Sequence, residues 1–594
     1  MSFLEFKNYR SRSQYDIAVV GAGISGLYCA WRLIRDNPKR KIAIVERLNR
    51  IGGRLDTDII KVANDQYVRE EEGGMRFDYG MMELMNLNKA LKLCDEIVPF
   101  PMGSANDTNR FLVRGHNFTV QEANATGNMI WSELYDLKPE EQGLSPTALV
   151  TNAYKNVLFA NGASYKPRQP KFWTKFRNKF TWKGKALNEW QLWGLLRDMN
   201  YSEECIQMLS ETIGFAGPFK SLANAGDAFQ ILADFPADPH YFTFKFGFST
   251  LPRAIAKELT TKYKDNVHIF LSTNVDSILK NRNGRFTLNM TKAPDELDSQ
   301  HFIPGGRPKM LNAEKLVVAA ATKGMQNLFA SSPALNRQAG SRKLWENINM
   351  AMGMKLMKIN LYFDKPWWEN GQTGRPPVQF GPNFTNLPVN AVYPFYSLPE
   401  GTEPPPELLK AAKSTPAIRD AAAALTIYCD FNNTNFWKGL QNIGPKFTSE
   451  LQEVQNSKKP QTLYPASRAV VDEAKKQLQA LFGTNWVPEP MLTSYRLWNG
   501  ENDFEYAYHQ WQLNVDDRKV RAYMSHPLEN IHFCNEAISD MQGWVNGSLR
   551  STNLVLEHFG LAPMPDDPCE DKTKKKKGSK DKATVMPKMG LWGS

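Results

Sequence analysis

The stretch Gly21-Ala22-Gly23-Ile24-Ser25-Gly26 decides the fold, because its glycines have the spacing G-x-G-x-x-G of a dinucleotide-binding turn. An apolar run at residues 17–20 precedes it, and a helical pattern through Leu27, Ala30 and Leu33 follows it. The order strand, glycine loop, helix aims the amino end of a helix at a phosphate group, while the glycines allow the tight turn and the close approach of the backbone. We therefore predict a nucleotide-binding βαβ unit near the start of the chain.

The next strand supports a flavin nucleotide. Apolar residues 42–45 end in Glu46, twenty residues after Gly26, where a carboxylate can accept hydrogen bonds from ribose hydroxyls and disfavours the 2′-phosphate of NADP. The following segment, Arg47-Leu48-Asn49-Arg50-Ile51-Gly52-Gly53-Arg54, adds two glycines for close backbone approach and a permanent charge at Arg54 beside phosphate. This addition favours FAD over NAD.

Motifs near the other end of the chain carry a family resemblance. Ile531-His532-Phe533-Cys534-Asn535-Glu536, followed by Gly543-Trp544-Val545-Asn546-Gly547-Ser548-Leu549, is similar to the closing flavin motif of the flavin monoamine oxidase superfamily. The resemblance implies a non-covalent FAD. One departure is that Cys534-Asn535-Glu536 replaces the usual Ala-Gly-Glu, although Glu536 can still reach a flavin hydroxyl or phosphate-side group. Covalent attachment through Cys534 is not expected, because the cysteine motif of mitochondrial monoamine oxidases has no match here.

Arg76, in Glu72-Gly73-Gly74-Met75-Arg76-Phe77, discriminates within the superfamily. The L-amino acid oxidases resemble the chain best, because they carry arginine at the matching position, whereas monoamine and polyamine oxidases act on substrates without a carboxylate. By this resemblance, Arg76 binds the substrate α-carboxylate as a planar two-pronged donor. The alternatives are a surface arginine and an arginine that binds the flavin phosphate.

A tyrosine is expected as the second carboxylate anchor. Val392-Tyr393-Pro394 resembles the segment of the family's carboxylate-binding tyrosine, so Tyr393 is the predicted residue. Tyr396 is close enough in sequence to be the true equivalent, and a buried structural tyrosine is a further alternative.

A lysine is the predicted catalytic residue. The spacing of Lys358 from Trp367-Trp368 matches the family lysine, which holds a water against flavin N5 and assists the reaction with oxygen. Alternation along a strand places Lys358 on the same face as Asn360 and Tyr362, so that it points into a cavity. Lys355 lies nearby and could be the family lysine instead, and Lys358 could also be a solvent-exposed strand lysine without a catalytic role.

The closing motif supplies the remaining substrate contacts. The resemblance implies that Trp544 forms one wall of the substrate cage and that the carbonyl of Gly543 accepts a hydrogen bond from the amino group. Residues 545–549 begin a helix whose amino end favours negative charge on the reduced flavin. No metal site is expected. The predicted cofactor-binding residues are Gly21, Gly23, Ile24, Ser25, Gly26, Glu46, Arg47, Gly53, Arg54, Gly74, Met75, Arg76, Val275, Glu536, Trp544, Val545 and Leu549.

The function that this resemblance implies is FAD-dependent oxidative deamination of L-amino acids to 2-oxo acids, with release of ammonia and hydrogen peroxide. Catalysis would depend chiefly on orientation of the amino acid. Oxygen is the expected acceptor because the sequence has no second G-x-G-x-x-G for a nicotinamide domain, although a dehydrogenase that reduces a quinone would look similar. Three other interpretations stay open. They are a decarboxylating amino acid monooxygenase that forms an amide, an amine or polyamine oxidase, and a non-enzymatic protein in which the basic segment and the tail bind nucleic acid and the flavin is vestigial.

Composition indicates a large enzyme without a membrane span. The chain has 594 residues, 42% of them hydrophobic, and no run of 18 apolar residues. The first residues lack a secretory apolar region, and the six cysteines form no C-x-x-C. We therefore expect reduced thiols in a cytoplasmic protein. A homo-oligomer, dimer or higher, is also expected.

The net charge of +11 is concentrated in two segments. Residues 572–594 carry a net charge of +7, and we expect 566–594 to be a disordered lysine-rich tail. Residues 165–185 hold eight Lys or Arg, no acid and interleaved aromatics. Such a pattern can serve nucleic acid or membrane surfaces, but an oligomer contact or an entrance lid is favoured, so nucleic acid is not an expected partner.

The order of the motifs predicts a mixed α/β fold with a discontinuous Rossmann-like FAD-binding domain. Its parts are residues 14–85, 245–330 and 529–562, which must converge on one cofactor. Residues 90–240 are predicted to form a mainly helical subdomain. Residues 331–528 are predicted to form a strand-containing substrate-binding domain.

Overall fold

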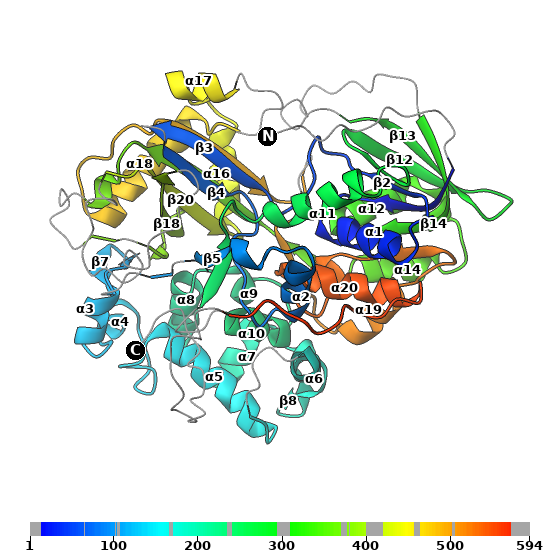
Figure 1. Cartoon of the computed structure of the whole chain (residues 1–594). Coiled ribbons are helices and arrows are strands. Elements are labelled where there is room, and N and C mark those ends of the chain that lie inside the picture. Colours follow the sequence, from blue (N-terminus) through cyan, green and yellow to red (C-terminus); the bar gives the residue numbers. More distant parts are fainter. Residues whose placement is uncertain are drawn as a thin grey trace.

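The computed structural model places three regions around a common centre (Figure 1). A sheet covered by helices lies on the right of this view, a second sheet lies at the upper left, and a group of helices lies below. The described residues are 14–63, 66–100, 102–103, 107–164, 170–234, 240–293, 309–369, 377–378, 380–399, 420–456, 464–501 and 505–571.

The first sheet is assembled from three distant parts of the chain. The order is β11-β2-β1-β14-β13-β12, with β23 pairing in parallel with β14. Its central strands are buried on both faces, as their continuous apolar sequences require of parallel strands between helices. The strands are β1 (Gln14–Val20), β2 (Ile42–Val45), β11 (Val267–Phe270), β12 (Thr273–Lys280), β13 (Phe286–Lys292), β14 (Lys309–Val318) and β23 (Ile531–Phe533).

Helices from both ends of the chain cover this sheet. α1 (Ile24–Asp36) follows the glycine loop and packs against both α11 (Thr250–Thr261) and α20 (Val545–Glu557) in one hydrophobic core. α12 (Thr322–Ser331) belongs to a second core on the other face. The prediction of a mixed α/β, Rossmann-like fold is therefore confirmed.

The second sheet contains the predicted lysine strand. Its order is β21-β16-β20-β18-β17-β6-β7, and every residue of β16 is buried. β6 and β7 come from within residues 90–240, so that mainly helical stretch also donates two strands to this sheet. The strands are β6 (Arg110–Val113), β7 (His116–Thr119), β16 (Leu356–Phe363), β17 (Asn383–Thr385), β18 (Ala391–Tyr396), β20 (Ala423–Asp430) and β21 (Leu492–Trp498).

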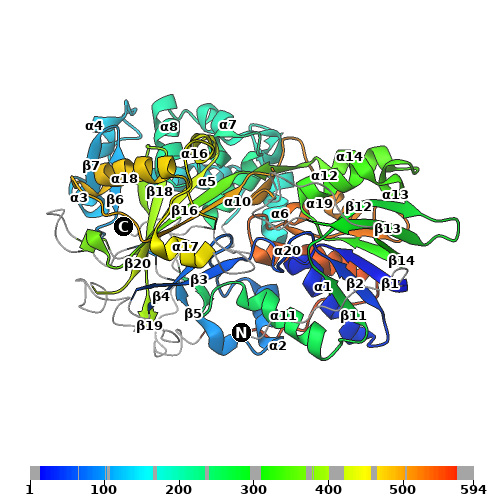
Figure 2. The same ribbon diagram turned by 90° about the horizontal axis from the view of Figure 1, so that it is seen from above.

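The helical group lies below the sheets in Figure 1 and in the upper middle of Figure 2, where α7 and α8 are at the top. No helix in the described ranges is long and apolar enough to cross a membrane. Of the predicted disordered tail 566–594, residues 572–594 lie outside the described residues. The prediction is wrong for 566–571, which are placed in the structure, with Cys569 buried and bonded to Cys94. The main helices are α5 (Pro146–Ala160), α6 (Pro170–Lys179), α7 (Leu192–Asp198), α8 (Glu203–Thr212) and α10 (Ala225–Ala233).

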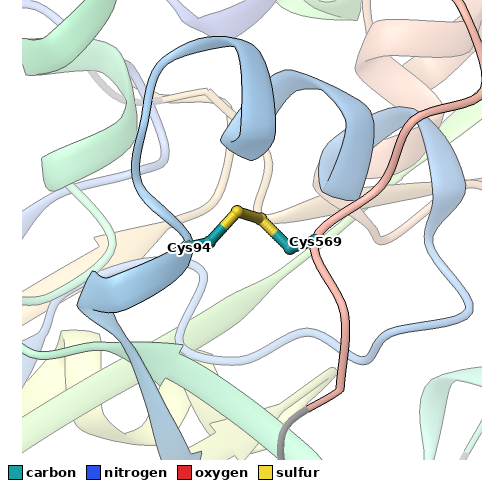
Figure 3. The surroundings of a disulfide bond; sticks show 2 residues. All are labelled: Cys94 and Cys569. Carbon is teal, nitrogen blue, oxygen red and sulfur yellow. A yellow bond between two sulfur atoms is a disulfide. The ribbon is translucent and has the colours of Figure 1, made fainter.

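The prediction that all six cysteines are reduced is wrong for two of them. Cys94 and Cys569 form a disulfide between the turn after α2 (Met82–Ala90) and the segment that follows α20 (Figure 3). The sequence separation of 475 residues hides the pair, because only the fold brings the two segments together. The cytoplasmic location, which also rested on the lack of a secretory apolar region, stays a prediction but loses the support of fully reduced cysteines.

Breaking this disulfide is expected to lower stability without unfolding the chain. Cys569 is 4% exposed and packs with α2 in the core beside α1, so noncovalent contacts remain after Cys94→Ser. We expect a loss of about 2–4 kcal/mol, seen as a lower Tm and faster proteolysis of the segment after α20. Thiol titration of the unfolded wild type provides the control, with four thiols before reduction and six afterwards. Six thiols before reduction would contradict the disulfide.

Candidate active site

A cavity of about 710 Å³ lies between the two sheets and the helical group. The glycine loop and the strand ends of the first sheet supply part of its wall, including Gly21, Val45 and Val275. The second sheet supplies Lys358 and Tyr428. The predicted nucleotide residues and the predicted substrate residues therefore share one continuous space.

The glycine loop is built for close packing at the start of α1. A Cβ added to Gly26 would lie 2.0 Å from the carbonyl oxygen of Gly21, so only glycine fits there. Nothing lies within 4 Å of a Cβ added to Gly23, which opens onto the cavity. The carboxylate of Glu46 accepts hydrogen bonds from the backbone N–H groups of Ala22 and Leu48 at 2.7 and 2.9 Å. Glu46 thus joins the glycine loop to the end of β2.

Glu536 links three separate segments of the chain, those that carry Arg54, His509 and Gly543. Its carboxylate accepts hydrogen bonds from Arg54 at 2.7 Å and from the backbone N–H groups of His509 and Gly543 at 2.9 and 2.7 Å. His509 Nδ1 lies 2.8 Å from the same carboxylate. These partners outweigh burial and hold the pKa of Glu536 well below its usual range. The carboxylate is therefore ionised and fixes Gly543, whose φ of +84° favours glycine.

Two helix amino ends open onto the cavity. α1 begins after Gly23 and α20 begins after Trp544, and neither helix has a side-chain cap. Uncapped amides and the helix dipole favour negative charge, as on a pyrophosphate or a reduced flavin ring. The cavity therefore fits FAD, with the glycine loop, Glu46 and Arg54 along its nucleotide part and residues 543–545 along its ring part.

Arg76 lies in the wall of the same cavity and is only 7% exposed. Its Nη1 lies 3.6 Å from the sulfur of Met75 and 3.7 Å from that of Met102. Its guanidinium carbon lies 5.0 Å from the ring centre of Tyr241. A permanent charge is thus held among sulfur and aromatic groups, where the low polarity strengthens its attraction for an anion.

The two candidate tyrosines of β18 have different environments. Tyr393 accepts a hydrogen bond from Arg76, although burial is the larger influence and raises the pKa of its hydroxyl. Tyr396 instead donates to Glu369 at 2.6 Å and accepts from Trp368 at 3.0 Å. The geometry therefore associates Tyr393 with Arg76 and gives Tyr396 a structural environment outside the cavity wall.

Sequence reasoning missed two further tyrosines in the cavity wall. Tyr428 lies opposite Lys358 in the register of β20 and β16, and burial raises the pKa of its hydroxyl although Arg76 lowers it. Tyr508 is 7% exposed, and burial raises its pKa as well. No motif marks either residue. Only the alternation of β20 opposite Lys358 could have suggested Tyr428.

Lys358 is 3% exposed and lines the cavity, whereas Lys355 does not. Its Nζ donates hydrogen bonds to the backbone carbonyls of Glu71 and Gly73, at 2.8 Å for Gly73. Burial lowers the pKa of Lys358 to about 8, although the carboxylates of Glu71 and its neighbours oppose this change. The amine can therefore change its charge near neutral pH.

Trp544 is positioned by a buried acid. Its Nε1 donates to Asp234 Oδ2 at 2.7 Å, and its ring stacks on Tyr241 with centroids 6.2 Å apart. This arrangement holds the indole at the amino end of α20, beside Gly543 in the cavity wall.

Most of the predicted site residues line the cavity, and three do not. Gly26 packs against β1, Leu549 is in the core beneath α20, and Tyr393 reaches the site only through Arg76. Cys534 is also fully buried in that core. The residues that line the cavity are Gly21, Gly23, Ile24, Ser25, Glu46, Arg47, Gly53, Arg54, Gly74, Met75, Arg76, Val275, Lys358, Glu536, Gly543, Trp544 and Val545.

The chain is similar to known proteins over most of its length. The family model of flavin containing amine oxidoreductases matches residues 24–410. An uncharacterized protein of Acanthamoeba polyphaga mimivirus is 22% identical over 93% of this chain and 96% of its own. Aplysianin-A of Aplysia kurodai is 22% identical over 94% of this chain and 92% of its own. Achacin of Lissachatina fulica is 37% identical, but over only 18% of this chain and 19% of its own.

Solved structures with the same fold include two named amine oxidases. Cyclohexylamine oxidase from Brevibacterium oxydans superposes with a TM-score of 0.55 at 16% identity, over 92% of this chain and 100% of its own. A variant of putrescine oxidase gives the same TM-score and identity over 92% of this chain and 99% of its own. At such low identity, the likeness shows the fold alone.

Proposed function

Because the chain belongs to the flavin-containing amine oxidoreductases and is an FAD-binding oxidoreductase, we propose that its substrates are L-amino acids. The proposed reaction converts an L-amino acid, oxygen and water into a 2-oxo acid, ammonia and hydrogen peroxide. FAD is proposed to be bound without a covalent link.

One observation carries the proposal, namely a buried guanidinium in the cavity wall beside two phenols. Arg76 provides a planar, permanently charged donor for a carboxylate. Because burial raises the pKa of Tyr393 and Tyr428, both hydroxyls stay protonated at neutral pH. A protonated phenol at Tyr428 can donate a second hydrogen bond to the same carboxylate.

The protein's contribution to the reaction is positioning. Arg76 would hold the carboxylate, Trp544 would bound the amino acid on one side, and the carbonyl of Gly543 would accept a hydrogen bond from its amino group. When bound, FAD supplies hydride acceptance from Cα and electron transfer to oxygen. The low-polarity surroundings of Met75 and Tyr241 exclude water from the charged contact.

Anaerobic mixing of the purified flavoprotein with a substrate panel tests this proposal. We expect L-amino acids to bleach the visible flavin absorbance, whereas D-amino acids, cyclohexylamine and putrescine should not, because they lack a correctly placed carboxylate. Bleaching by the amines but not by L-amino acids would overturn the proposal. Aerobic products give a second readout, since a 2-oxo acid with hydrogen peroxide identifies an oxidase and an amide identifies a monooxygenase.

A further inference from the structure

A second cavity, of about 530 Å³, lies outside the candidate active site between α6, α19 (Asp517–Met524) and α20. Figure 1 shows α19 and α20 next to each other with α6 below them, and α6 packs against α19. Six of the nine lining residues are basic and one is acidic. The wall consists of Pro170, Lys171, Thr174, Lys175, Lys179, Arg518, Arg521, Asp540 and Arg550.

α6 explains much of the basic and aromatic pattern of residues 165–185, of which 165–169 lie outside the described residues. Lys171, Lys175 and Lys179 are spaced four residues apart, so they project from one exposed face of the helix into this cavity. Trp173 and Phe176 are buried on the opposite face. The aromatic side chains therefore pack in the core, and the three lysines line the cavity. Among the described residues, none of these three lysines forms an ion pair with a carboxylate.

The facing wall holds arginines in a network with an excess of positive charge. Arg550 Nη2 and Arg521 Nη1 lie 2.5 and 3.4 Å from Asp540 Oδ2. Arg521 Nε lies 3.1 Å from Asp517 Oδ2, which also pairs with the buried Arg177 at 2.9 Å. Three guanidinium groups thus share two carboxylates.

The remaining charges near the wall do not neutralise it. Arg518 is paired with Asp516 at 2.7 Å, and Arg550 Nε lies 3.8 Å from Glu83. With these two acids counted, seven basic side chains, Arg177 among them, face four carboxylates, which leaves a net charge of +3. Positive potential in a concave space concentrates anions.

We propose that this cavity binds a small polyphosphate anion. Its volume is in the range of small-molecule sites, and its basic side chains come from three helices that line one space, which suits a compact ligand better than a long polymer. Lysines bind phosphate as point charges, and arginines bind it through their paired donors. A ligand with several charges can contact both walls at once.

Calorimetric titration of the full-length holoenzyme with sodium tripolyphosphate tests the site. We expect one-to-one binding by the wild type, with affinity about tenfold or more weaker in Lys171→Gln/Lys175→Gln/Lys179→Gln, because three charges leave one wall. The matched control is Lys257→Gln/Lys262→Gln/Lys264→Gln, which removes three exposed lysines in and beyond α11. It should bind like the wild type. Unchanged flavin absorbance shows that each variant is folded.

Other outcomes would overturn the proposal. Absence of binding by the wild type, or an equal loss in both triple variants, would show that the charges act only as a general surface field. Sodium sulfate at matched ionic strength should not compete, and full competition would show a nonspecific effect. A single-stranded oligonucleotide that binds through the same lysines, while tripolyphosphate does not, would assign the surface to an extended polymer.

Discussion

Replacing Arg76 with methionine is expected to lower kcat/KM for L-amino acids by about a thousandfold, or about 4 kcal/mol, which is typical for removing one partner of a buried charged pair. Methionine can fill the space beside Met75, Met102 and Tyr241, so the fold and the bound flavin should remain. Steady-state kinetics with the best amino acid of the panel measures the effect.

Graded variants separate orientation from charge. Arg76→Lys keeps the charge but loses the planar fork, so we expect an intermediate loss. Tyr393→Phe should lower kcat/KM, whereas Tyr396→Phe should not, because Tyr396 is bonded to Glu369 outside the cavity wall. A colourless apoprotein from Arg76→Met would make Arg76 a cofactor residue. Unchanged amino acid kinetics would remove the proposed carboxylate contact.

Replacing Lys358 with methionine is expected to slow reoxidation of the reduced enzyme by oxygen by about a hundredfold, the scale of losing one preorganised charged donor. Reduction by the amino acid should change less, because Arg76 and Trp544 position the substrate. Stopped-flow mixing of reduced enzyme with oxygen measures reoxidation separately from reduction. The matched control is Lys355→Met, which removes a lysine outside the cavity wall.

The pH dependence gives an independent test of Lys358. Its pKa of about 8 means that the amine is charged below this pH and neutral above it. If the charge assists oxygen reduction, the reoxidation rate of the wild type should fall as the pH rises through about 8. The reoxidation rate of Lys358→Met should not fall in this pH range. An identical profile in the variant would assign the titration to another group, such as Glu70 or Glu71, whose pKa values burial raises to about 8 and about 7.

The nucleotide half of the site could be predicted from sequence because it depends on local chain geometry. The glycine loop, β1, β2 and α1 occur within residues 14–45, and their apolar periods and glycine spacing are short-range signals. FAD as cofactor is confirmed by the match to the flavin containing amine oxidoreductases. Gly26 shows the limit of this reasoning, because the third glycine serves the packing of the helix on the strand rather than the wall of the cavity.

The substrate half depends on contacts between distant strands, which a single sequence does not reveal. Tyr428 reaches the cavity because β20 pairs with β16 opposite Lys358, and Tyr508 reaches it from a segment without a motif. Tyr393 and Tyr396 cannot be separated by spacing alone, since the partners that distinguish them, Arg76 for Tyr393 and Glu369 for Tyr396, come from distant segments. The disulfide between Cys94 and Cys569 is hidden for the same reason. The homo-oligomer and the cytoplasmic location stay predictions.

Because β23 pairs in parallel with β14, the first sheet and the flavin site are complete only after residues 531–557 have been synthesised. During synthesis β1, β2 and β14 leave the ribosome long before residues 531–557, which supply β23, Glu536 and α20. Until then, Leu316–Val318 would present an uncovered strand edge, and the flavin would have only part of its binding surface. Flavin loading is therefore expected to follow the emergence of residues 531–557, which close this edge and complete the binding surface.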